Sequence, residues 1–188
     1  MGISLANKIS LGRLLLIPFF TACLLYYRPE RDGLRYAAAG LFLVGVLSDA
    51  VDGYIARAKA QWTRLGTFLD PLADKLMLLA AYLSLGLVNG IPDDLRMPAW
   101  VIIVLVSREC LIVMGSVLVY HLTGRLDIRP TRLGKWATFM QMLTVLIVLL
   151  RWPHAAWCWS SAVALTIASG AVYLRRGARL LNSSPSVS

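Results

Sequence analysis

Long apolar segments separated by short polar breaks dominate the pattern of this chain. Six such segments of about 20 residues each follow one another, at 5–27, 34–57, 66–90, 97–122, 132–152 and 156–176. The breaks between them carry charged residues, proline or glycine, as at 28–33 and 91–98. About 20 apolar residues in a helix cross a bilayer core roughly 30 Å thick. The pattern therefore predicts an all-α integral membrane protein with six transmembrane helices.

Composition supports a single membrane-embedded domain. The 188 residues are 58% hydrophobic and only 15% charged, whereas a soluble domain carries about 25% charged residues. No polar stretch is long enough to fold separately, so residues 1–180 are expected to form one domain. Residues 181–188 are polar and are predicted to be a disordered tail.

The net charge of +9 raises the possibility of nucleic-acid binding, but the positive charges flank the apolar segments instead of forming one stripe. Such charges orient helices and meet anionic lipid headgroups. Six spans place both termini on one side, and that side carries twelve Lys and Arg residues against five on the other. This excess predicts cytoplasmic termini and a cytoplasmic connection between the second and third spans.

Four aspartates lie in or beside the second and third apolar segments. Asp49 and Asp52 are three residues apart and Asp70 and Asp74 are four apart, so each pair shares one helix face. A carboxylate at a helix centre in hydrocarbon costs roughly 2.5–3.5 kcal/mol, and four close together also repel. A shared divalent cation removes both penalties. Oxygen ligands without nearby His or Cys favour Mg²⁺ or Mn²⁺ over zinc, and two ions about 4 Å apart around a reacting phosphoryl group are a recurring arrangement.

Small residues extend the face that carries Asp49 and Asp52, at Gly45, Gly53 and Ala56. Small residues at this spacing permit close helix packing, and they also leave room for a ligand beside a metal. The two interpretations are compatible, and the embedded carboxylates favour the ligand. We therefore expect a polar active-site cavity at the cytoplasmic side.

The segment 49–74 reads D-x2-D-G-x2-A-R-x8-G-x3-D-x3-D, with every fixed position filled. It resembles the signature of the CDP-alcohol phosphatidyltransferase family. The resemblance implies transfer of a substituted phosphate from a CDP-linked donor to an alcohol, with CMP leaving, in a homodimeric membrane protein. It also implies roles for individual residues. Two Mg²⁺ or Mn²⁺ ions would be bound by Asp49, Asp52 and Asp70, with Asp74 on or near them, and Asp74 would act as the base. The nucleotide and its diphosphate would be surrounded by Asp52, Gly53, Ala56, Arg57 and Gly66.

Weaker matches indicate a subfamily. The stretch 7–13 followed by L-L-L-I-P-F-F, the stretch 68–75, S-R-E at 107–109, and Lys135 with Gln141 resemble bacterial phosphatidylglycerophosphate synthases. That resemblance implies CDP-diacylglycerol as donor, glycerol 3-phosphate as acceptor and the bacterial inner membrane as location. Similar segments occur in CDP-alcohol-type cardiolipin synthases, which use phosphatidylglycerol, and an inositol-phosphate enzyme has the same charge requirement. The acceptor therefore stays open.

Basic residues of the fourth and fifth spans are candidates for binding an acceptor phosphate. Arg108 lies inside a span next to Glu109, so it forms either an internal Arg–carboxylate pair or a cavity-facing phosphate ligand. Arg125, Arg132 and Lys135 gather at the cytoplasmic ends of these spans, where they contribute to topology and headgroup binding or to a phosphate pocket.

A cation transporter is the alternative from a different class, because it also needs carboxylates within the membrane. A transport path would distribute acidic residues through the membrane depth. Here Asp49, Asp52, Asp70 and Asp74 lie near one face, beside Gly and Arg. This clustering favours the transferase.

Overall fold

The computed structural model describes the backbone of residues 5–30, 32–59, 64–88, 92–93, 96–123 and 131–183. It describes the side chains of these residues except those at 5–10, 49–59, 64–72, 74, 116–123 and 176–183. Within these ranges the chain is all-α and contains six helices, which are α1 (Leu5–Leu25), α2 (Asp32–Lys59), α3 (Arg64–Leu87), α4 (Ala99–Thr123), α5 (Arg132–Leu149) and α6 (Ala155–Ser183). The predicted all-α class is confirmed, and each predicted span coincides with one helix.

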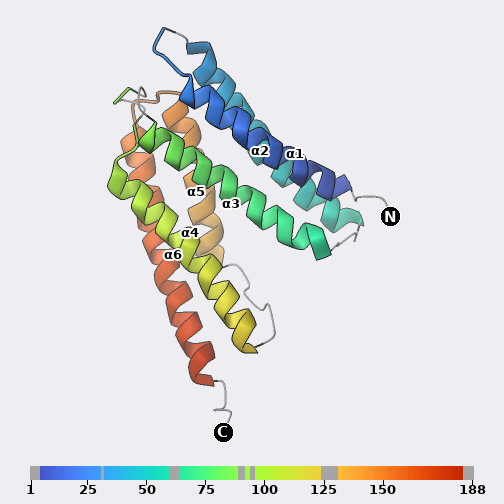
Figure 1. Cartoon of the computed structure of the whole chain (residues 1–188). Helices are drawn as coiled ribbons and strands as arrows, with labels where there is room; N and C mark the ends of the chain where they lie inside the picture. Colours follow the sequence, from blue (N-terminus) through green and yellow to red (C-terminus); the bar gives the residue numbers. More distant parts are fainter. Residues whose placement is uncertain are drawn as a thin grey trace.

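Consecutive helices run in opposite directions and form two groups that meet along α3 (Figure 1). In the first group α1 packs against both α2 and α3, and in the second α6 packs against both α4 and α5. Contacts of α3 with α4 and α5, and of α2 with α5, join the groups. The helix α3, which carries half of the aspartate motif, is therefore held from both sides.

The ends of α5 show how the sequence sets the helix boundaries. Thr131 is the N-cap residue, and its Oγ1 accepts a hydrogen bond of 2.9 Å from the Gly134 backbone N–H. At the other end Leu150 caps the helix and donates its backbone N–H to the carbonyl of Leu146. Arg151 then adopts a left-handed backbone with φ of 54°, which turns the chain out of the helix.

Apolar side chains from α1 to α6 form one buried core. Phe20 of α1 and Phe42 of α2 are fully buried, with ring centroids 5.8 Å apart. Trp100 of α4 meets Trp159 of α6 edge to face at 5.4 Å. Aromatic pairs of this kind contribute beyond the area they bury, so these two help to hold α1 against α2 and α4 against α6.

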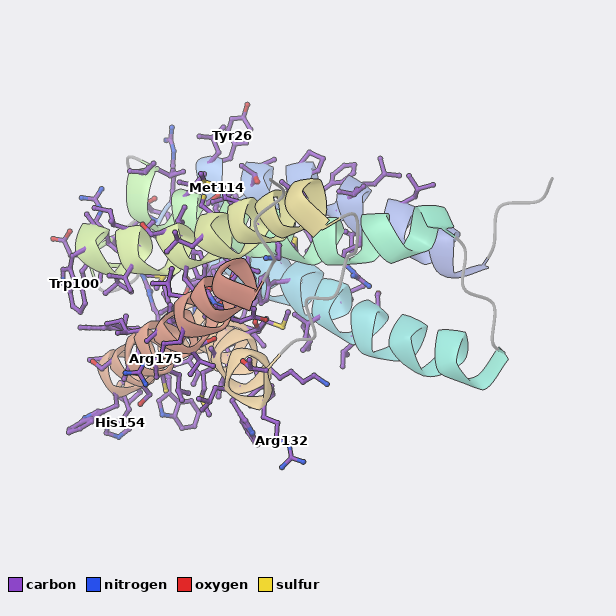
Figure 2. The ribbon with its side chains drawn as sticks, turned by 90° about the horizontal axis from the view of Figure 1, so that it is seen from below. Tyr26, Trp100, Met114, Arg132, His154 and Arg175 are labelled. Carbon is purple, nitrogen blue, oxygen red and sulfur yellow. The ribbon has the colours of Figure 1, made fainter. Side chains whose placement is uncertain are left out.

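The exterior is apolar as well. Exposed fractions reach 64% at Phe19, 68% at Met114 and 76% at Trp157, and Figure 2 shows Tyr26, Trp100 and Met114 directed away from the bundle. Exposed apolar surface on this scale marks a membrane or protein interface. Two segments in the described part of the chain, Arg132–Leu149 and Ala155–Arg175, are long and apolar enough to cross a membrane.

A polar cluster ties the α1–α2 turn to the α5–α6 turn. Asp32 accepts hydrogen bonds from the Arg35 guanidinium and from the Tyr27 hydroxyl, and Arg151 lies within 3.8 Å of the same carboxylate. Arg35 also donates to the backbone carbonyl of Leu149 at 2.7 Å. We call Tyr27, Asp32, Arg35 and Arg151 the Asp32 cluster. The hydrogen bond from Arg35 is the main cause that holds the pKa of Asp32 below its ordinary value of 3.8.

The sixth helix is longer than predicted. Its helical backbone continues through Ser183, so the first residues of the predicted tail are helical, and residues 184–188 lie outside the described range. A helix continues beyond its apolar stretch because its backbone hydrogen bonds are internal, while charged side chains such as Arg175 are exposed.

Candidate active site

The aspartate motif lies at the end of α2 and the start of α3. Asp49 and Asp52 belong to the last turns of α2, whereas Asp70 and Asp74 belong to the first turns of α3. Gly53, Ala56, Arg57 and Gly66 occupy the helical positions between these pairs. The side chains of all these residues lie outside the described part, so the predicted metal and nucleotide contacts stay predictions.

Helix geometry nevertheless relates the two aspartate pairs. Asp49 lies ten residues before the end of α2 and Asp74 lies ten residues after the start of α3. At 1.5 Å per residue both are about 15 Å from the connection between the helices. Since α2 and α3 run in opposite directions (Figure 1), the two positions are at matched distances along neighbouring helices. The same holds for Asp52 and Asp70, at about 10 Å.

Gly45 shows which way the motif-bearing face of α2 is turned. A Cβ atom at Gly45 would lie 3.5 Å from Met77 Cε of α3 and 3.8 Å from Arg13 Cγ of α1. Asp49 follows Gly45 by four residues and occupies the same face of the helix. At Gly45 this face is turned toward α1 and α3. Arg13, only 2% exposed, brings a buried cationic side chain to the same junction, a contribution that the sequence reasoning missed.

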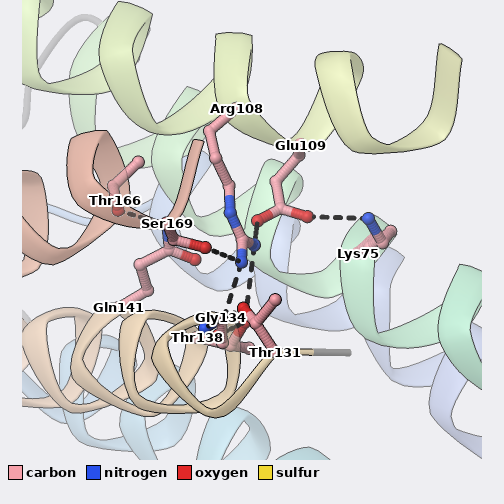
Figure 3. Close-up of polar contacts among 9 residues, drawn as sticks. All are labelled: Lys75, Arg108, Glu109, Thr131, Gly134, Thr138, Gln141, Thr166 and Ser169. Carbon is pink, nitrogen blue, oxygen red and sulfur yellow. Dashed lines mark hydrogen bonds and ion pairs between the residues drawn. The ribbon is translucent and has the colours of Figure 1, made fainter. Parts of the chain in front are cut away.

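Arg108 lies at the centre of a buried polar network between α4, α5 and α6 (Figure 3). Its Nη1 forms an ion pair with Glu109 Oε1 and lies 3.5 Å from Thr138 Oγ1. Its Nη2 donates to the Gly134 carbonyl at 3.3 Å and to Ser169 Oγ at 3.4 Å. The internal Arg–carboxylate pair considered from the sequence is thus present, and Arg108 also reaches the first turn of α5.

Glu109 links this network to α3. Its Oε2 accepts a hydrogen bond of 2.9 Å from Lys75 Nζ, so one carboxylate lies between two cations. Lys75 immediately follows Asp74 in the chain. Sequence reasoning considered Glu109 only as a partner of Arg108 and assigned no role to Lys75, although an ionisable residue within an apolar segment is itself a signal of a functional or paired site.

The other candidates for an acceptor phosphate separate into two groups. Arg132 and Lys135 are exposed on the first turn of α5, and Figure 2 shows Arg132 extending away from the bundle. Arg125 lies outside the described residues. Because Arg108 contacts Gly134, its guanidinium is close to the helix turn that carries Arg132 and Lys135.

The side chains that the structure describes include no group of three or more His, Cys, Asp or Glu suited to a metal ion. The four motif aspartates are not among those side chains. A set of four carboxylates without histidine or cysteine is the donor chemistry that Mg²⁺ and Mn²⁺ prefer. The motif therefore fits a hard divalent cation.

A helical bundle with an apolar exterior, a carboxylate motif on two neighbouring helices and a buried cationic network indicates a membrane-associated enzyme that handles phosphate groups. Comparison with known families agrees, because residues 3–170 match the family model described as CDP-alcohol phosphatidyltransferase. The chain belongs to this family. The match favours the transferase over the cation transporter.

Curated relatives match most of the chain. A Bacillus subtilis protein named CDP-diacylglycerol–glycerol-3-phosphate 3-phosphatidyltransferase is 36% identical, over 96% of this chain and 98% of its own length. A Mycobacterium tuberculosis protein named probable phosphatidylglycerophosphate synthase is 30% identical, over 94% of this chain and 82% of its own. A rice protein named cardiolipin synthase (CMP-forming) is 31% identical, over 78% of this chain but only 46% of its own length.

Proposed function

We propose that this protein transfers the phosphatidyl group of CDP-diacylglycerol to glycerol 3-phosphate, with release of CMP. The observation that carries the proposal is the near full-length similarity to a relative bearing that name, together with a complete aspartate motif on α2 and α3. In the reaction an acceptor hydroxyl oxygen forms a bond to the phosphatidyl phosphorus. The bond from that phosphorus to the CMP oxygen breaks, and the hydroxyl proton passes to a base.

We assign the base to Asp74. The carboxylate of a residue crowded by other carboxylates keeps a raised proton affinity, and Asp74 belongs to a motif with Asp49, Asp52 and Asp70. Arg57 is assigned to the diphosphate, while Gly53, Ala56 and Gly66 leave space for the cytidine. Arg108, Arg125, Arg132 and Lys135 are the candidates for the acceptor phosphate.

Asp49, Asp52, Asp70 and Asp74 are proposed to hold Mg²⁺ or Mn²⁺, with two ions expected. The bound metal would offset negative charge on the diphosphate of the donor. Removal of divalent cations with a chelator is accordingly expected to abolish CMP release, and either ion should restore it. CMP release that continues at the same rate in excess chelator would contradict this assignment.

We further propose that all six helices cross the bacterial inner membrane, with both termini and the motif in the cytoplasm. Six helices at the predicted positions, the apolar exterior and the distribution of Lys and Arg support this topology. A homodimer within the membrane is proposed from the family resemblance alone. Single cysteines introduced near each helix end, labelled from one side of sealed vesicles, test the topology, and labelling of both termini from the periplasmic side would contradict it.

Phosphatidylglycerol is the second candidate acceptor, because one relative is named cardiolipin synthase. An acceptor panel distinguishes the two. Purified protein receives CDP-diacylglycerol, Mg²⁺ or Mn²⁺, and either glycerol 3-phosphate, phosphatidylglycerol or inositol phosphate. The proposal requires lipid product and CMP with glycerol 3-phosphate. Product with phosphatidylglycerol alone would overturn the acceptor and retain the chemistry.

A further inference from the structure

Lys75 and Arg108 come from different helices and share one carboxylate. Lys75 of α3 and Arg108 of α4 each form a salt bridge with a different oxygen of Glu109. The exposed fractions of the side chains are 28% for Lys75, 14% for Glu109 and 7% for Arg108. The arrangement is therefore a mostly buried link between two helices (Figure 3).

The three side chains carry one positive charge in excess. Two cations share one anion. Among the side chains that the structure describes, Glu109 supplies the carboxylate that lies within salt-bridge distance of both Lys75 and Arg108. The Nε atom of Arg108 is buried without a hydrogen-bond partner among those same residues. Buried charge is costly unless it is paired and hydrogen-bonded. The group of Lys75, Arg108 and Glu109, called the Glu109 cluster below, therefore has both the charge and a spare hydrogen-bond donor for one anion.

The location of the Glu109 cluster indicates which anion it binds. Lys75 is one residue beyond Asp74 and hence at almost the same level along α3. Arg108 donates to the carbonyl of Gly134, which precedes Lys135 on the first turn of α5. The cluster thus lies between the motif-bearing part of α3 and the basic start of α5. An acceptor whose phosphate binds near this position has its hydroxyl groups within reach of the motif.

We propose that Glu109 is a positioning residue for the acceptor: its carboxylate holds the Lys75 ammonium and the Arg108 guanidinium together, so that their excess positive charge binds the phosphate of the acceptor alcohol. This inference rests on the proposed function. Without the carboxylate the two cations repel each other, and the more exposed Lys75 swings away into solvent. The acceptor phosphate then loses one charge-assisted hydrogen bond, and the acceptor becomes harder to bind.

The test is Glu109→Gln, with glycerol 3-phosphate and CDP-diacylglycerol titrated separately in turnover and thermal-shift experiments. KM and Kd for glycerol 3-phosphate are expected to rise about tenfold or more, the loss of one charge-assisted hydrogen bond. The same constants for CDP-diacylglycerol should stay within twofold. Glu109→Asp retains the charge and is expected to recover most of the affinity for glycerol 3-phosphate, which a merely structural role would not produce.

Asp32→Asn is the matched control. Asp32 is also a carboxylate between two cations, Arg35 and Arg151, but in the turns that join α1 to α2 and α5 to α6. This variant should unfold at a lower temperature and keep its KM and Kd for glycerol 3-phosphate within twofold of wild type. An equal loss of acceptor affinity in both variants would overturn the proposal, since it would show a general effect of weakened packing.

The remaining outcomes are also decisive. If Glu109→Gln does not fold, Lys75→Gln takes its place, because Arg108 and Glu109 remain a neutral pair, and the affinity for glycerol 3-phosphate should fall by a similar factor. Normal acceptor constants in the replacement variant, or in Glu109→Gln, overturn the role of Glu109 and leave the proposed function intact. A wild-type protein that neither binds nor uses glycerol 3-phosphate overturns the proposed function first and this inference with it.

Discussion

The close approach of α3 and α4 at Gly86 gives a prediction that the structure makes quantitative. A Cβ atom at Gly86 would lie 1.9 Å from Ile102 Cδ1 and 3.4 Å from Ile102 Cγ1. Ile102 is 6% exposed, so it has little space into which to rotate. The connection between the helices also folds back onto α3, because Met97 donates its backbone N–H to the carbonyl of Leu85. The substitution Gly86→Ala therefore forces a buried side chain to move.

Two opposing effects set the magnitude. Overpacking a buried contact costs about 1–3 kcal/mol, while replacing Gly by Ala in a helix gains about 1 kcal/mol. Gly86→Ala should thus lower the free energy of unfolding by about 0–2 kcal/mol. Ile102→Val removes the clashing Cδ1 atom and alone costs about 0.5–1.5 kcal/mol. In the Ile102→Val background Gly86→Ala should become neutral or stabilising, with a coupling of about 1–3 kcal/mol between the two substitutions.

Denaturant-induced unfolding in detergent micelles, followed by far-ultraviolet circular dichroism, measures all four proteins of this cycle. Gly40→Ala is the control, because a Cβ built at Gly40 has no heavy atom within 4 Å beyond its chain neighbours and the nearby backbone of its own helix, and it should be neutral or stabilising by up to about 1 kcal/mol. If Gly86→Ala has the same effect with Ile102 and with Val at that position, the helices do not approach as described and the reasoning is refuted.

Three further predictions concern charged residues. Arg108→Lys should lower the free energy of unfolding by about 1–3 kcal/mol in the same assay, because one ammonium cannot reach Glu109, the Gly134 carbonyl and Ser169 together. Unchanged stability would show that these hydrogen bonds of Arg108 do not stabilise the fold. The pKa of Asp32 is lowered in the folded protein, so its ionised form stabilises the fold above its ordinary pKa of 3.8, and this contribution is lost as the pH falls below that value. The difference in melting temperature between wild type and Asp32→Asn should accordingly shrink as the pH falls from roughly 6 to roughly 3, because Asp32 becomes protonated in both states once the pH is well below 3.8. A constant difference over this range would argue against the ion pair. Asp74→Asn should slow CMP release by about 10²–10⁴-fold, the usual effect of losing a general base, with an unchanged far-ultraviolet spectrum, and wild-type turnover would remove Asp74 from the mechanism.

The helices could be predicted from the sequence because a bilayer imposes a length on apolar segments. The predicted 66–90 and the observed Arg64–Leu87 differ by a few residues at each end. The end of α6 was harder to predict, because the charges at Arg175 and Arg176 mark the end of an apolar stretch and not the end of a helix.

The site could be predicted only in part. Local spacing identifies Asp49, Asp52, Asp70 and Asp74, since both pairs lie within single helices. The pairing of Lys75 with Glu109 spans 34 positions and depends on how α3 packs against α4, which no local pattern encodes. The contact of Arg35 with the Leu149 carbonyl spans 114 positions and was missed for the same reason.

The central claim is that the chain transfers a phosphatidyl group to glycerol 3-phosphate, and the identity of the lipid product tests it most directly. Purified protein is incubated with CDP-diacylglycerol, Mg²⁺ and isotope-labelled glycerol 3-phosphate, and lipid and nucleotide products are measured by mass spectrometry. The account predicts labelled phosphatidylglycerophosphate and CMP in equal amounts. CMP without labelled lipid would contradict it. Absence of CMP with glycerol 3-phosphate, when the same protein releases CMP with a different acceptor, would contradict it as well.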